Sequence, residues 1–533
     1  MRSAETTSVL VVGAGPVGLT LSLLLSGYGV EHLVVEAREG TSAHPKARGV
    51  SARSMEVFRR LGVEADVRRA GLPASHVFFY RGRDLVDPDF TRTGVTGPPA
   101  GEGGAQGGVE RTPSPGLICS QDALEAVLLR HGRERAPGRV RFATRLLSFT
   151  EEADGVRAVL EDRAGGARRT VRAGLLVGCD GAASTVRAGA GIAMEGPTGL
   201  GHFLSIRFEA PLGAVVADRA SASYFLTAPG RGGFLAVDND RHWIYQHPCD
   251  PRDGDLARLR DDHRELARLV REAAGLPGLE VTVRDTMTWR MDARLAASYR
   301  RSRVLLAGDA AHVVPPTGGH GMNTGIGDAD NLAWKLAAVV HGPAGERLLD
   351  TYQDERRPLA RQVIDLSLAN SRARAGYRID DELLLTARYR SAAVVDGGDD
   401  GGGGGHQGGA PLDPACGRWD GGPGARLPHL RLGPGAGAAS TLDLVGPGFA
   451  LLTPAGGDVG AAWRRQADTA SAAGLPVALR PLPAGAGALG VAAGGALLVR
   501  PDGHLAWQAP RPPADDTHLL AVLRRILAAP APR

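Results

Sequence analysis

Apolar and polar residues alternate in different ways along the chain, and the first segment shows the clearest pattern. Residues 8–12 (SVLVV) are a short β-branched run, which predicts a buried strand. A glycine-rich turn at residues 13–18 follows, and an apolar helix is expected over residues 19–25. A second apolar strand at residues 32–35 ends at Glu36. Strand, turn, helix and strand within about 30 residues are typical of a unit that begins a parallel α/β sheet.

The pattern changes twice further along the chain. Between residues 198 and 289 short strands alternate with turns, which predicts a separate antiparallel sheet, interrupted by one polar helix at residues 255–272. Residues 304–306 return to a buried strand that leads into Gly308-Asp309. Other expected elements are helices at residues 54–61, 120–129, 328–340 and 517–527, helical texture over 350–385, and strands at 140–149, 156–160 and 174–177.

Two glycine-rich spacers interrupt these elements. Residues 97–108 (GPPAGEGGAQGG) predict a flexible loop, and residues 396–409 (DGGDDGGGGGHQGG) predict a disordered linker. Beyond the linker, short strands alternate with Gly and Pro turns over residues 410–533, which indicates a further module.

Composition excludes several classes of protein. The 533 residues are 43% hydrophobic and carry a net charge of only +4, so a core is available and no polybasic nucleic-acid surface is indicated. The four cysteines are far apart, without CxxC or zinc spacing, so we expect no metal and a reducing, cytoplasmic location. No apolar run is long enough for a transmembrane helix. A signal peptide at the N-terminus is disfavoured because Glu5 and several glycines interrupt the pattern.

The first glycine motif has the residues that a dinucleotide requires. Gly13 would make the tight turn, Gly15 would let the backbone approach a pyrophosphate, and Gly18 would let the helix pack on the strand. Glu36, at the end of the second strand, can accept a hydrogen bond from a ribose hydroxyl. The alternative is a glycine-rich turn that binds no ligand.

The second motif is RVLLAGDAAHVVPPTGGHGMNTG at residues 303–325. A strand delivers Asp309 to its carboxyl end, where a carboxylate suits a polyol hydroxyl. Gly318, Gly319 and Gly321 would then expose backbone N–H groups near a helix start, which suit an anionic or carbonyl oxygen. The alternative is an acidic turn residue, but the two motifs together favour a long, two-part cofactor.

These motifs, with GCDGAASTVR at residues 178–187 between them, resemble the flavoprotein monooxygenases of the p-hydroxybenzoate hydroxylase type over residues 8–390. Length, STLDLVGPGF (440–449) and LLVRPDGHLAWQ (497–508) resemble the FAD-dependent hydroxylases of aromatic polyketides. The resemblance implies an α/β fold with a Rossmann-like FAD-binding domain, an interleaved antiparallel-sheet substrate domain and a thioredoxin-like C-terminal domain. That last domain lacks CxxC, so a structural or dimerisation role is expected.

The implied domain boundaries follow from the same resemblance. The FAD-binding domain would comprise residues 1–75, 115–190 and 297–395, and the substrate domain residues 76–114 and 191–296. Residues 396–409 would form the linker, and residues 410–533 the C-terminal domain.

The resemblance also implies contacts with FAD. The pyrophosphate would be held by Gly13–Gly18, the adenosine ribose by Glu36 with Ala37, and the ribitol or pyrophosphate region by Asp309. Asp180 and Arg187 belong to the central motif, which is linked to both FAD and NADPH. The complete set of implied cofactor-binding residues is Gly13, Ala14, Gly15, Pro16, Gly18, Glu36, Ala37, Arg48 (beside the flavin or its phosphates), Gln121, Leu146 (adenine, through its backbone), Asp180, Arg187, Asp309, Gly319, Gly321, Met322 and Asn323 (near the flavin carbonyls).

Some residues allow two interpretations. His320 and Gly327 stand where Gln is frequent in the family, and His320 would either tune the flavin or be a loop histidine held by the backbone. Tyr224, Tyr245 and Trp289 would either line a substrate pocket or pack in the sheet. His312 is expected to be a structural turn residue.

The implied reaction is hydroxylation of an electron-rich aromatic, expected to be a polycyclic polyketide, through a C4a-hydroperoxyflavin. A second nucleotide-binding domain is not evident in the sequence, and the resemblance implies that NADPH, or NADH in its place, would bind transiently, reduce FAD and leave. No side chain is assigned as a catalytic base. The expected partners are an aromatic substrate and dioxygen, with no nucleic acid and no membrane, on a monomer or homodimer. The alternatives are Baeyer–Villiger oxygen insertion, flavin reduction without oxygen transfer, and a non-catalytic nucleotide- or drug-binding module.

Overall fold

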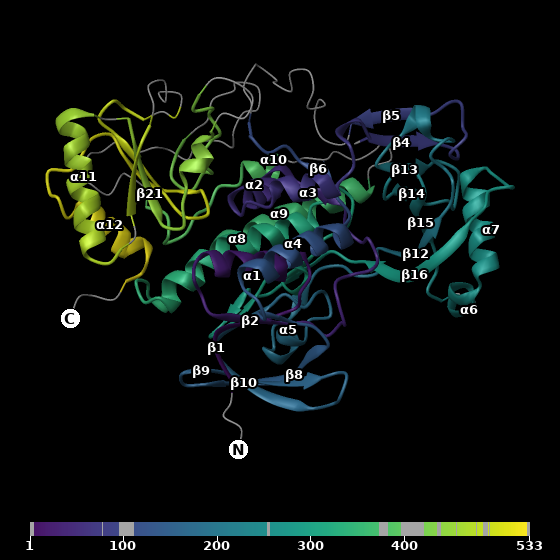
Figure 1. Ribbon diagram of the computed structural model, residues 1–533, viewed down its shortest axis with the longest axis horizontal. Coiled ribbons are helices and arrows are strands. Elements are labelled where there is room, and N and C mark those ends of the chain that lie inside the picture. The colour runs from purple at the N-terminus through teal and green to yellow at the C-terminus, as the bar shows by residue number, and fades with distance from the viewer. Residues whose placement is uncertain are drawn as a thin grey trace.

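The computed structural model describes residues 5–76, 78–94, 111–252, 256–372, 382–395, 421–433, 439–454, 456–475, 477–482, 489 and 491–529. The expected loop at 97–108 and linker at 396–409 lie outside these residues. Figure 1 shows a central body around helices α1, α4 and α8, with a second sheet beside α7 at one end and the C-terminal elements around α11 and α12 at the other.

The largest sheet lies in the central body and is mainly parallel at its centre. Its strand order is β18-β19-β10-β1-β2-β7, and a β8–β9 hairpin extends antiparallel from β10. The pairs β19–β10, β10–β1, β1–β2 and β2–β7 are parallel. The strands are β1 (Glu5–Val12), β2 (His32–Val35), β7 (Val140–Arg141), β8 (Thr144–Glu152), β9 (Gly155–Asp162), β10 (Arg168–Gly178), β18 (Arg300–Arg301) and β19 (Val304–Leu306).

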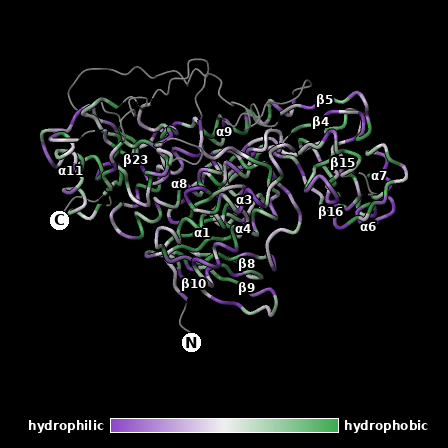
Figure 2. Tube along the Cα trace, turned by 45° about the horizontal axis from the view of Figure 1, so that its top comes forward, coloured by the Kyte–Doolittle hydropathy of each residue, from purple (hydrophilic) through white to green (hydrophobic). Residues whose placement is uncertain are grey.

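Helix α1 (Pro16–Gly27) is the centre of the main hydrophobic core. Its leucines, from Leu19 to Leu25, are buried, as expected for a helix that is apolar on nearly all sides. Figure 2 shows hydrophobic segments gathered around it. Helices α4 (Gln121–Arg135) and α8 (Gly321–Val340) pack against α1. No helix within the described ranges is long and apolar enough to cross a bilayer.

The second sheet is antiparallel except where β13 pairs with β4. Leu204, Ile206 and Phe208 point from one face into a separate core against α7 (His263–Ala274). The order is β16 (Thr282–Met291), β12 (Gly201–Glu209), β15 (His242–Pro248), β14 (Gly233–Ala236), β13 (Ser223–Leu226), β4 (Phe78–Gly82) and β5 (Thr91–Gly94).

The helix expected at residues 255–272 is in fact two helices, α6 (Leu256–Asp261) and α7. Asp262 separates them, because its carboxylate accepts hydrogen bonds from the backbone N–H groups of Arg264 and Glu265. An N-cap residue has a non-helical backbone conformation, so the helix before Asp262 ends there.

Shorter elements connect these layers. They are β3 (Gly49–Val50) paired with β6 (Leu117–Ile118), the sheet β11 (Met194–Glu195), β17 (Arg294–Ala296) and β20 (His312–Val313), the helices α2 (Ala52–Arg60), α3 (Glu64–Ala70), α5 (Thr185–Gly189), α9 (Asp350–Arg372) and α10 (Glu382–Leu385), and 3₁₀ turns at Ala74–His76, Ala217–Arg219, Gly308–Ala310, Glu346–Leu349 and Thr441–Leu444.

The C-terminal elements form a thioredoxin-like sheet with the order β22-β21-β23-β24. A parallel pair, β21–β22, is joined by α11, and an antiparallel hairpin follows. The hydrophobic core of this module also contains Trp334 of α8, so the module is packed onto the central body. The elements are β21 (Phe449–Thr453), α11 (Gly457–Ala472), β22 (Val477–Pro481), β23 (Ala496–Val499), β24 (Leu505–Ala509) and α12 (His518–Ile526).

A fully buried ionic network joins the C-terminal module to α8 and α9. Arg500 donates two hydrogen bonds to Glu355, at 2.6 and 2.9 Å, and also pairs with Asp502. Lys335 of α8 donates to the same Glu355 carboxylate at 2.8 Å. Burial lowers the pKa of Lys335 to about 8, against the attraction of Glu355. Buried charges need partners, so this network determines where the C-terminal module packs on α8 and α9.

We expect Arg500→Met to lower the free energy of unfolding by about 3–5 kcal/mol, because Glu355 and Asp502 would keep buried charge without their main partner. Chemical denaturation of the FAD-loaded protein measures this. Arg284→Met is the matched control, since the exposed Arg284–Glu209 pair should add little. Equal effects of the two substitutions would contradict the prediction.

A second prediction concerns pH. Burial lowers the pKa of His504 from 6.5 to about 4, although Asp502 opposes this shift. The unfolded chain therefore binds a proton at His504 between pH 6.5 and 4 that the folded chain does not, so His504 makes stability fall as the pH falls through that range, by at most about 1.4 kcal/mol per pH unit.

The measurement is thermal or denaturant unfolding at several pH values. His504→Phe should flatten the pH dependence between 6.5 and 4, while it keeps a ring that can stack on Tyr389, whose centroid is 4.1 Å from that of His504. An unchanged slope in this variant would show that other groups control acid stability.

Candidate cofactor and substrate site

Three sequence motifs meet at the carboxyl ends of β1, β10 and β19. The backbone N–H of Gly13 donates to Val35 (2.7 Å), and that of Cys179 donates to Val12 (2.8 Å). The N–H of Ala307 donates to Gly178 at 2.9 Å. This edge of an open parallel sheet is where α/β proteins bind ligands.

Two glycines of the first motif are required by contacts within the protein. Gly13 has φ +106°, and an added Cβ would lie 2.3 Å from the Cys179 carbonyl oxygen. A Cβ on Gly18 would lie 1.9 Å from the Gly13 oxygen. Side chains at these positions would push the turn away from β10 and α1 away from the turn.

Gly15 is different, because no protein contact requires it to be glycine. Its φ is −76°, and within the described residues a Cβ would meet only Glu125 Oε1, at 3.9 Å. Ala14 and Pro16 flank it, and α1 begins at Pro16 with neither a side-chain cap nor an acidic first turn. Open space above bare backbone at a helix N-terminus fits a pyrophosphate.

Glu36 lies at the end of β2, as predicted, and contacts the glycine turn. Its Oε2 accepts from the Ala14 N–H at 2.9 Å, and its Oε1 accepts from Arg38 N and Nε. Burial raises the pKa of Glu36, but these hydrogen bonds outweigh burial and hold it below its ordinary value. Glu36 is therefore a buried, ionised acceptor beside the turn.

Ala37 and Leu146 lie on the Glu36 side of the glycine turn. Thr144, which opens β8, donates its N–H to the Glu36 carbonyl oxygen at 2.8 Å, and Leu146 follows two residues later. The Ala37 carbonyl accepts from Arg163. These positions are consistent with an adenosine end of the site, but the predicted contact of Leu146 with adenine stays a prediction.

The central motif is held to the third motif by Arg187. Its Nη1 donates to the Ala310 carbonyl oxygen at 3.0 Å, and its Nη2 donates to Ala182. Asp180 accepts from the Ser184 hydroxyl and the Val186 N–H. Burial raises the pKa of the Asp180 carboxyl despite these bonds.

Asp309 lies in the 3₁₀ turn after β19. Its side chain is exposed, whereas its neighbours Gly308 and Ala310 are buried. The surrounding protein raises its pKa, while His312 and Lys46 act in the opposite direction. Packing of Val17 of α1 against Gly308 brings this turn to the first glycine motif.

Helix α8 begins at Gly321, seven residues before the start expected from the sequence. Gly321 and Met322 are therefore the first residues of a helix and not part of a loop, whereas Gly319 lies in the exposed turn before it. The helix start has no side-chain cap and no acidic residue in its first turn. Its orphan N–H groups suit a carbonyl oxygen of a flavin.

Asn323 has a structural role that the sequence did not predict. Its Oδ1 accepts from Ser51 N and Ser54 Oγ, and its Nδ2 donates to the carbonyls of Gly49 and Gly319. These four bonds use the capacity of the side chain, so any flavin contact of Asn323 would be through its backbone.

Arg48 and Gln121 lie between the central body and the second sheet. The Arg48 guanidinium is buried and donates to the carbonyls of Ala222 and Ala236 and to Ser223 Oγ, at 2.7–2.8 Å. Gln121 opens α4 and binds Ala47 through both its backbone and its side chain. Flavin contacts of Arg48 and Gln121 stay predictions.

The structure places the four residues that had two interpretations in different surroundings. Tyr224 and Tyr245 are buried in the α7-facing core of the second sheet, so packing is their role here. Trp289 lies in β16 outside this core and stacks on Phe203. His320 is buried at the start of α8. At Gly327 a Cβ would lie 2.7 Å from Arg356 Nη2, which explains glycine at that position.

His312 has the structural role that was expected. Its Nε2 contacts Asp328 Oδ2 at 2.7 Å, and Arg356 donates to the other carboxylate oxygen at 2.8 Å. Asp328 also accepts from the Gly308 N–H at 3.1 Å. This buried cluster fixes the turn that carries Asp309.

Sequence reasoning missed Glu125 and Arg38. Glu125 is fully buried and accepts from Ser42 N at 2.6 Å and from Gln121 Nε2 at 2.7 Å. The spacing of Gln121 and Glu125 was a usable signal, because residues four apart share a helix face. Arg38 lies two residues after Glu36, and the arginine-rich composition hid its significance.

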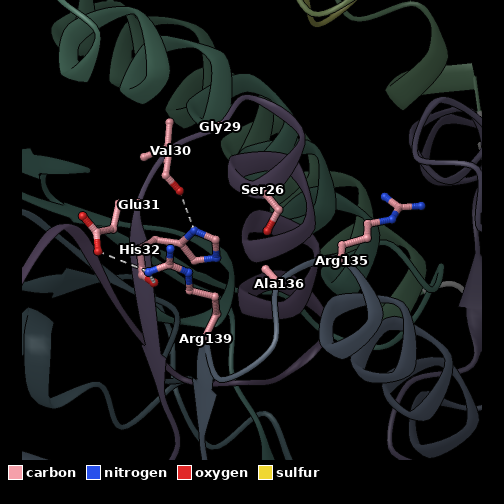
Figure 3. A pocket seen from close by; sticks show the side chains of 8 residues that line it. All are labelled: Ser26, Gly29, Val30, Glu31, His32, Arg135, Ala136 and Arg139. Atoms are coloured by element: carbon pink, nitrogen blue, oxygen red, sulfur yellow. Dashed lines mark hydrogen bonds and ion pairs between the residues drawn. The ribbon is translucent and has the colours of Figure 1, made fainter.

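A separate surface pocket lies at the opposite end of α1. Figure 3 shows it between Ser26 and His32, with Arg135 from the end of α4 and Arg139 from the segment before β7. His32 is engaged by the Val30 carbonyl at 2.9 Å and by Ser22 Oγ at 2.8 Å. None of the motif residues lines this pocket, so it is distinct from the candidate site.

Comparison with known proteins gives two family matches. Residues 6–367 match a family described as an FAD binding domain, and residues 420–530 match one described as aromatic-ring hydroxylase, C-terminal. Together these matches span the central body, the second sheet and the C-terminal module.

Similar proteins extend over the whole chain. A tetracenomycin A2 monooxygenase-dioxygenase of Streptomyces glaucescens is 38% identical, covering 99% of this chain and 98% of its own. An aklavinone 12-hydroxylase of Streptomyces purpurascens is 37% identical over 97% of this chain and 98% of its own.

Two solved structures are also similar. The flavin-dependent monooxygenase PieE, in complex with FAD and substrate, has a TM-score of 0.86 at 32% identity, covering 98% of this chain and 99% of its own. An aklavinone-11 hydroxylase with FAD and aklavinone has a TM-score of 0.83 at 36% identity, covering 99% and 100%.

Gly15→Ala tests the position of the pyrophosphate. We expect this variant to fold with a melting temperature near that of the wild-type apoprotein, because among the described residues only Glu125 Oε1 comes near the methyl group, at 3.9 Å. Its FAD content after gel filtration should fall by about tenfold or more, because the methyl group would occupy the pyrophosphate position.

Gly13→Ala is the matched control and should instead destabilise the apoprotein itself, since its methyl group collides with β10. If Gly15→Ala retained full FAD occupancy, the open space above Gly15 would not be the cofactor site.

Proposed function

Because the chain belongs to the FAD-dependent aromatic hydroxylases of the p-hydroxybenzoate hydroxylase type, we propose that it hydroxylates a polycyclic aromatic polyketide, with NADPH as reductant and dioxygen as oxidant. One observation carries this proposal. Three motifs distant in sequence meet at the glycine turn, where Gly13 lies against Cys179 and Val17 lies against Gly308, and Glu36 accepts from Ala14 in the same turn.

We infer that the chain holds an extended FAD along this line. Gly13, Gly15 and Gly18 would cradle the pyrophosphate at the α1 N-terminus, and Glu36 would accept from the adenosine ribose. Asp309 would accept from the ribitol or pyrophosphate region. The first-turn N–H groups of α8, at Gly321 and Met322, would face the flavin carbonyls.

Bound FAD would supply electrons from NADPH to dioxygen and so allow transfer of one oxygen atom to an aromatic carbon. The chain's own residues would bind the cofactor, orient the substrate and exclude water. The turn carrying Asp309 is fixed by the buried Asp328, and the loop before α2 is fixed by Asn323. These bonds would hold both loops in one position beside the bound cofactor.

We propose the same domain division that the sequence predicts. It is supported by the origin of the strands: the largest sheet draws on residues 5–35, 140–178 and 300–306, and the second sheet on residues 78–94 and 201–291. The C-terminal sheet draws on residues 449–509, and we propose a structural role for it, supported by the buried Arg500–Glu355 pair.

The test is turnover with FAD, NADPH, a panel of polycyclic phenols and ¹⁸O-labelled dioxygen. We expect one labelled oxygen atom in the product, present only with NADPH, and a new phenol in its fragmentation pattern. An inserted ester oxygen would instead identify Baeyer–Villiger chemistry.

Two other results would count against the proposal. NADPH oxidation that continues without oxygen, and without any gain in product mass, would indicate a reductase. FAD that is bound but not reduced by NADPH would indicate a binding module without catalysis.

A further inference from the structure

The second sheet has two faces of different character. Leu204, Ile206 and Tyr245 point to the α7 side. Because successive side chains of a strand alternate, Phe203, Ser205 and Gln246 point to the opposite side. Trp289 lies directly across from Phe203 and shares its face. This face is partly polar, and the loop that follows Glu36 lies against it, as the contacts below show.

An aromatic pair lies on this face, near the end where β16 leads back to the central body. The ring centroids of Phe203 and Trp289 are 4.5 Å apart with an interplanar angle of 15°, so the rings are stacked. Both residues are partly exposed. A flat, partly exposed aromatic surface suits a polycyclic aromatic ligand.

A directed chain of hydrogen bonds connects this pair to the interior. Trp289 Nε1 can only donate, and it donates to Gln246 Oε1 at 2.8 Å. Gln246 Nε2 donates to Ser205 Oγ at 3.0 Å. Ser205 Oγ lies 2.8 Å from His44 Nε2, and His44 Nδ1 lies 2.8 Å from Asp285 Oδ1. The side-chain positions of Trp289 and Gln246 are therefore tied to that of His44.

His44 belongs to a loop of the cofactor side. Two residues earlier, the Ser42 N–H donates to Glu125 of α4 at 2.6 Å. Two residues later, Lys46 lies near enough to Asp309 to affect its pKa. Arg207 of β12 donates to the Ala43 carbonyl oxygen at 2.6 Å, so the loop is bonded to the sheet at two consecutive residues, Ala43 and His44.

We propose that Phe203 and Trp289 form a stacking wall for one ring of the polycyclic substrate, and that His44 is a positioning residue that holds this wall in register with the cofactor loop. This inference rests on the proposed function, since it assigns the substrate surface of the same site. His44 acts through Ser205 and Gln246 and does not itself contact the substrate.

The chain contains an internal contrast to His44. His242 also pairs with an aspartate through its Nδ1, namely Asp238 in the turn between β14 and β15. It lies at the start of β15, opposite Glu209, which is at the far end of β12 from Phe203. Its side chain is 45% exposed, and it has no bond to the cofactor loop among the described residues. His242→Asn is therefore a matched control.

The wall is tested on the FAD-loaded, oxidised full chain without NADPH. Alizarin, a tricyclic hydroxyanthraquinone, and resorcinol, a single-ring phenol, are titrated by difference absorbance. We expect Trp289→Leu to weaken alizarin binding about tenfold, and Trp289→Phe, which keeps a stacking ring but loses the bond to Gln246, to weaken it about fivefold. Resorcinol binding should change little, because a single ring does not need the wall. Equal loss for both ligands, or no loss, would overturn the wall.

The positioning role is tested by two conservative substitutions. Gln can reach Ser205 from position 44 in place of Nε2, whereas Asn replaces only the Nδ1 bond to Asp285. We therefore expect His44→Gln to bind alizarin within about twofold of wild type and His44→Asn to bind it about fivefold more weakly. In turnover with NADPH and air, the Asn variant should divert more NADPH to hydrogen peroxide.

The FAD content and melting temperature of these variants separate positioning from folding. We expect both to stay near wild type in His44→Gln and in His242→Asn. If Gln and Asn variants bound alizarin equally, or if His242→Asn matched His44→Asn, His44 would have no positioning role. If wild-type protein bound neither alizarin nor related polycycles and formed no product from them, the proposed function would fail, and this inference with it.

Discussion

Polar side chains buried along α8 determine how the rest of the chain can be arranged. Burial of an amide or a charge without a partner costs several kcal/mol, so each of these side chains must be met by another segment. Asn323 binds the loop before α2, Asp328 binds the turn of Gly308 and α9, and Lys335 binds Glu355. The helix thus connects the expected flavin end of the site to the C-terminal module within 20 residues.

The C-terminal module takes part in this arrangement although it lacks the cysteines of a redox thioredoxin. Arg500 and Asp502 enter the buried network beside α8, and Arg53 of α2 donates to the Asp502 carbonyl oxygen. The module therefore contacts both α2 and α8. The module adds Arg500 and Asp502 to the buried Lys335–Glu355 pair and so gives Glu355 a second cationic partner.

Much of the fold could be predicted because its signals are local. The spacing of Gly13, Gly15 and Gly18 and the position of Glu36 specify a turn, a helix start and an acceptor within one βαβ unit. The start of α8 at Gly321 was misjudged, because glycine has a low helix propensity and tertiary packing decides such a case. His44 could not be paired with Asp285, since 241 residues separate them. Residue spacing along the sequence does not show which distant segments come into contact.

The order of strands in the largest sheet has a consequence for synthesis of the protein. Strand β10 is complete at residue 178, but its parallel neighbour β19 begins at Val304. At roughly 5–20 residues per second, a ribosome needs on the order of 6–25 s to make the intervening chain. During that interval β9 already covers Arg168–Ala173 on this side of β10, and only the last three residues, Leu176–Gly178, have no strand beside them. That short apolar edge stays open to pairing with another chain until β19 is made, so the parallel centre of the sheet is completed late in synthesis.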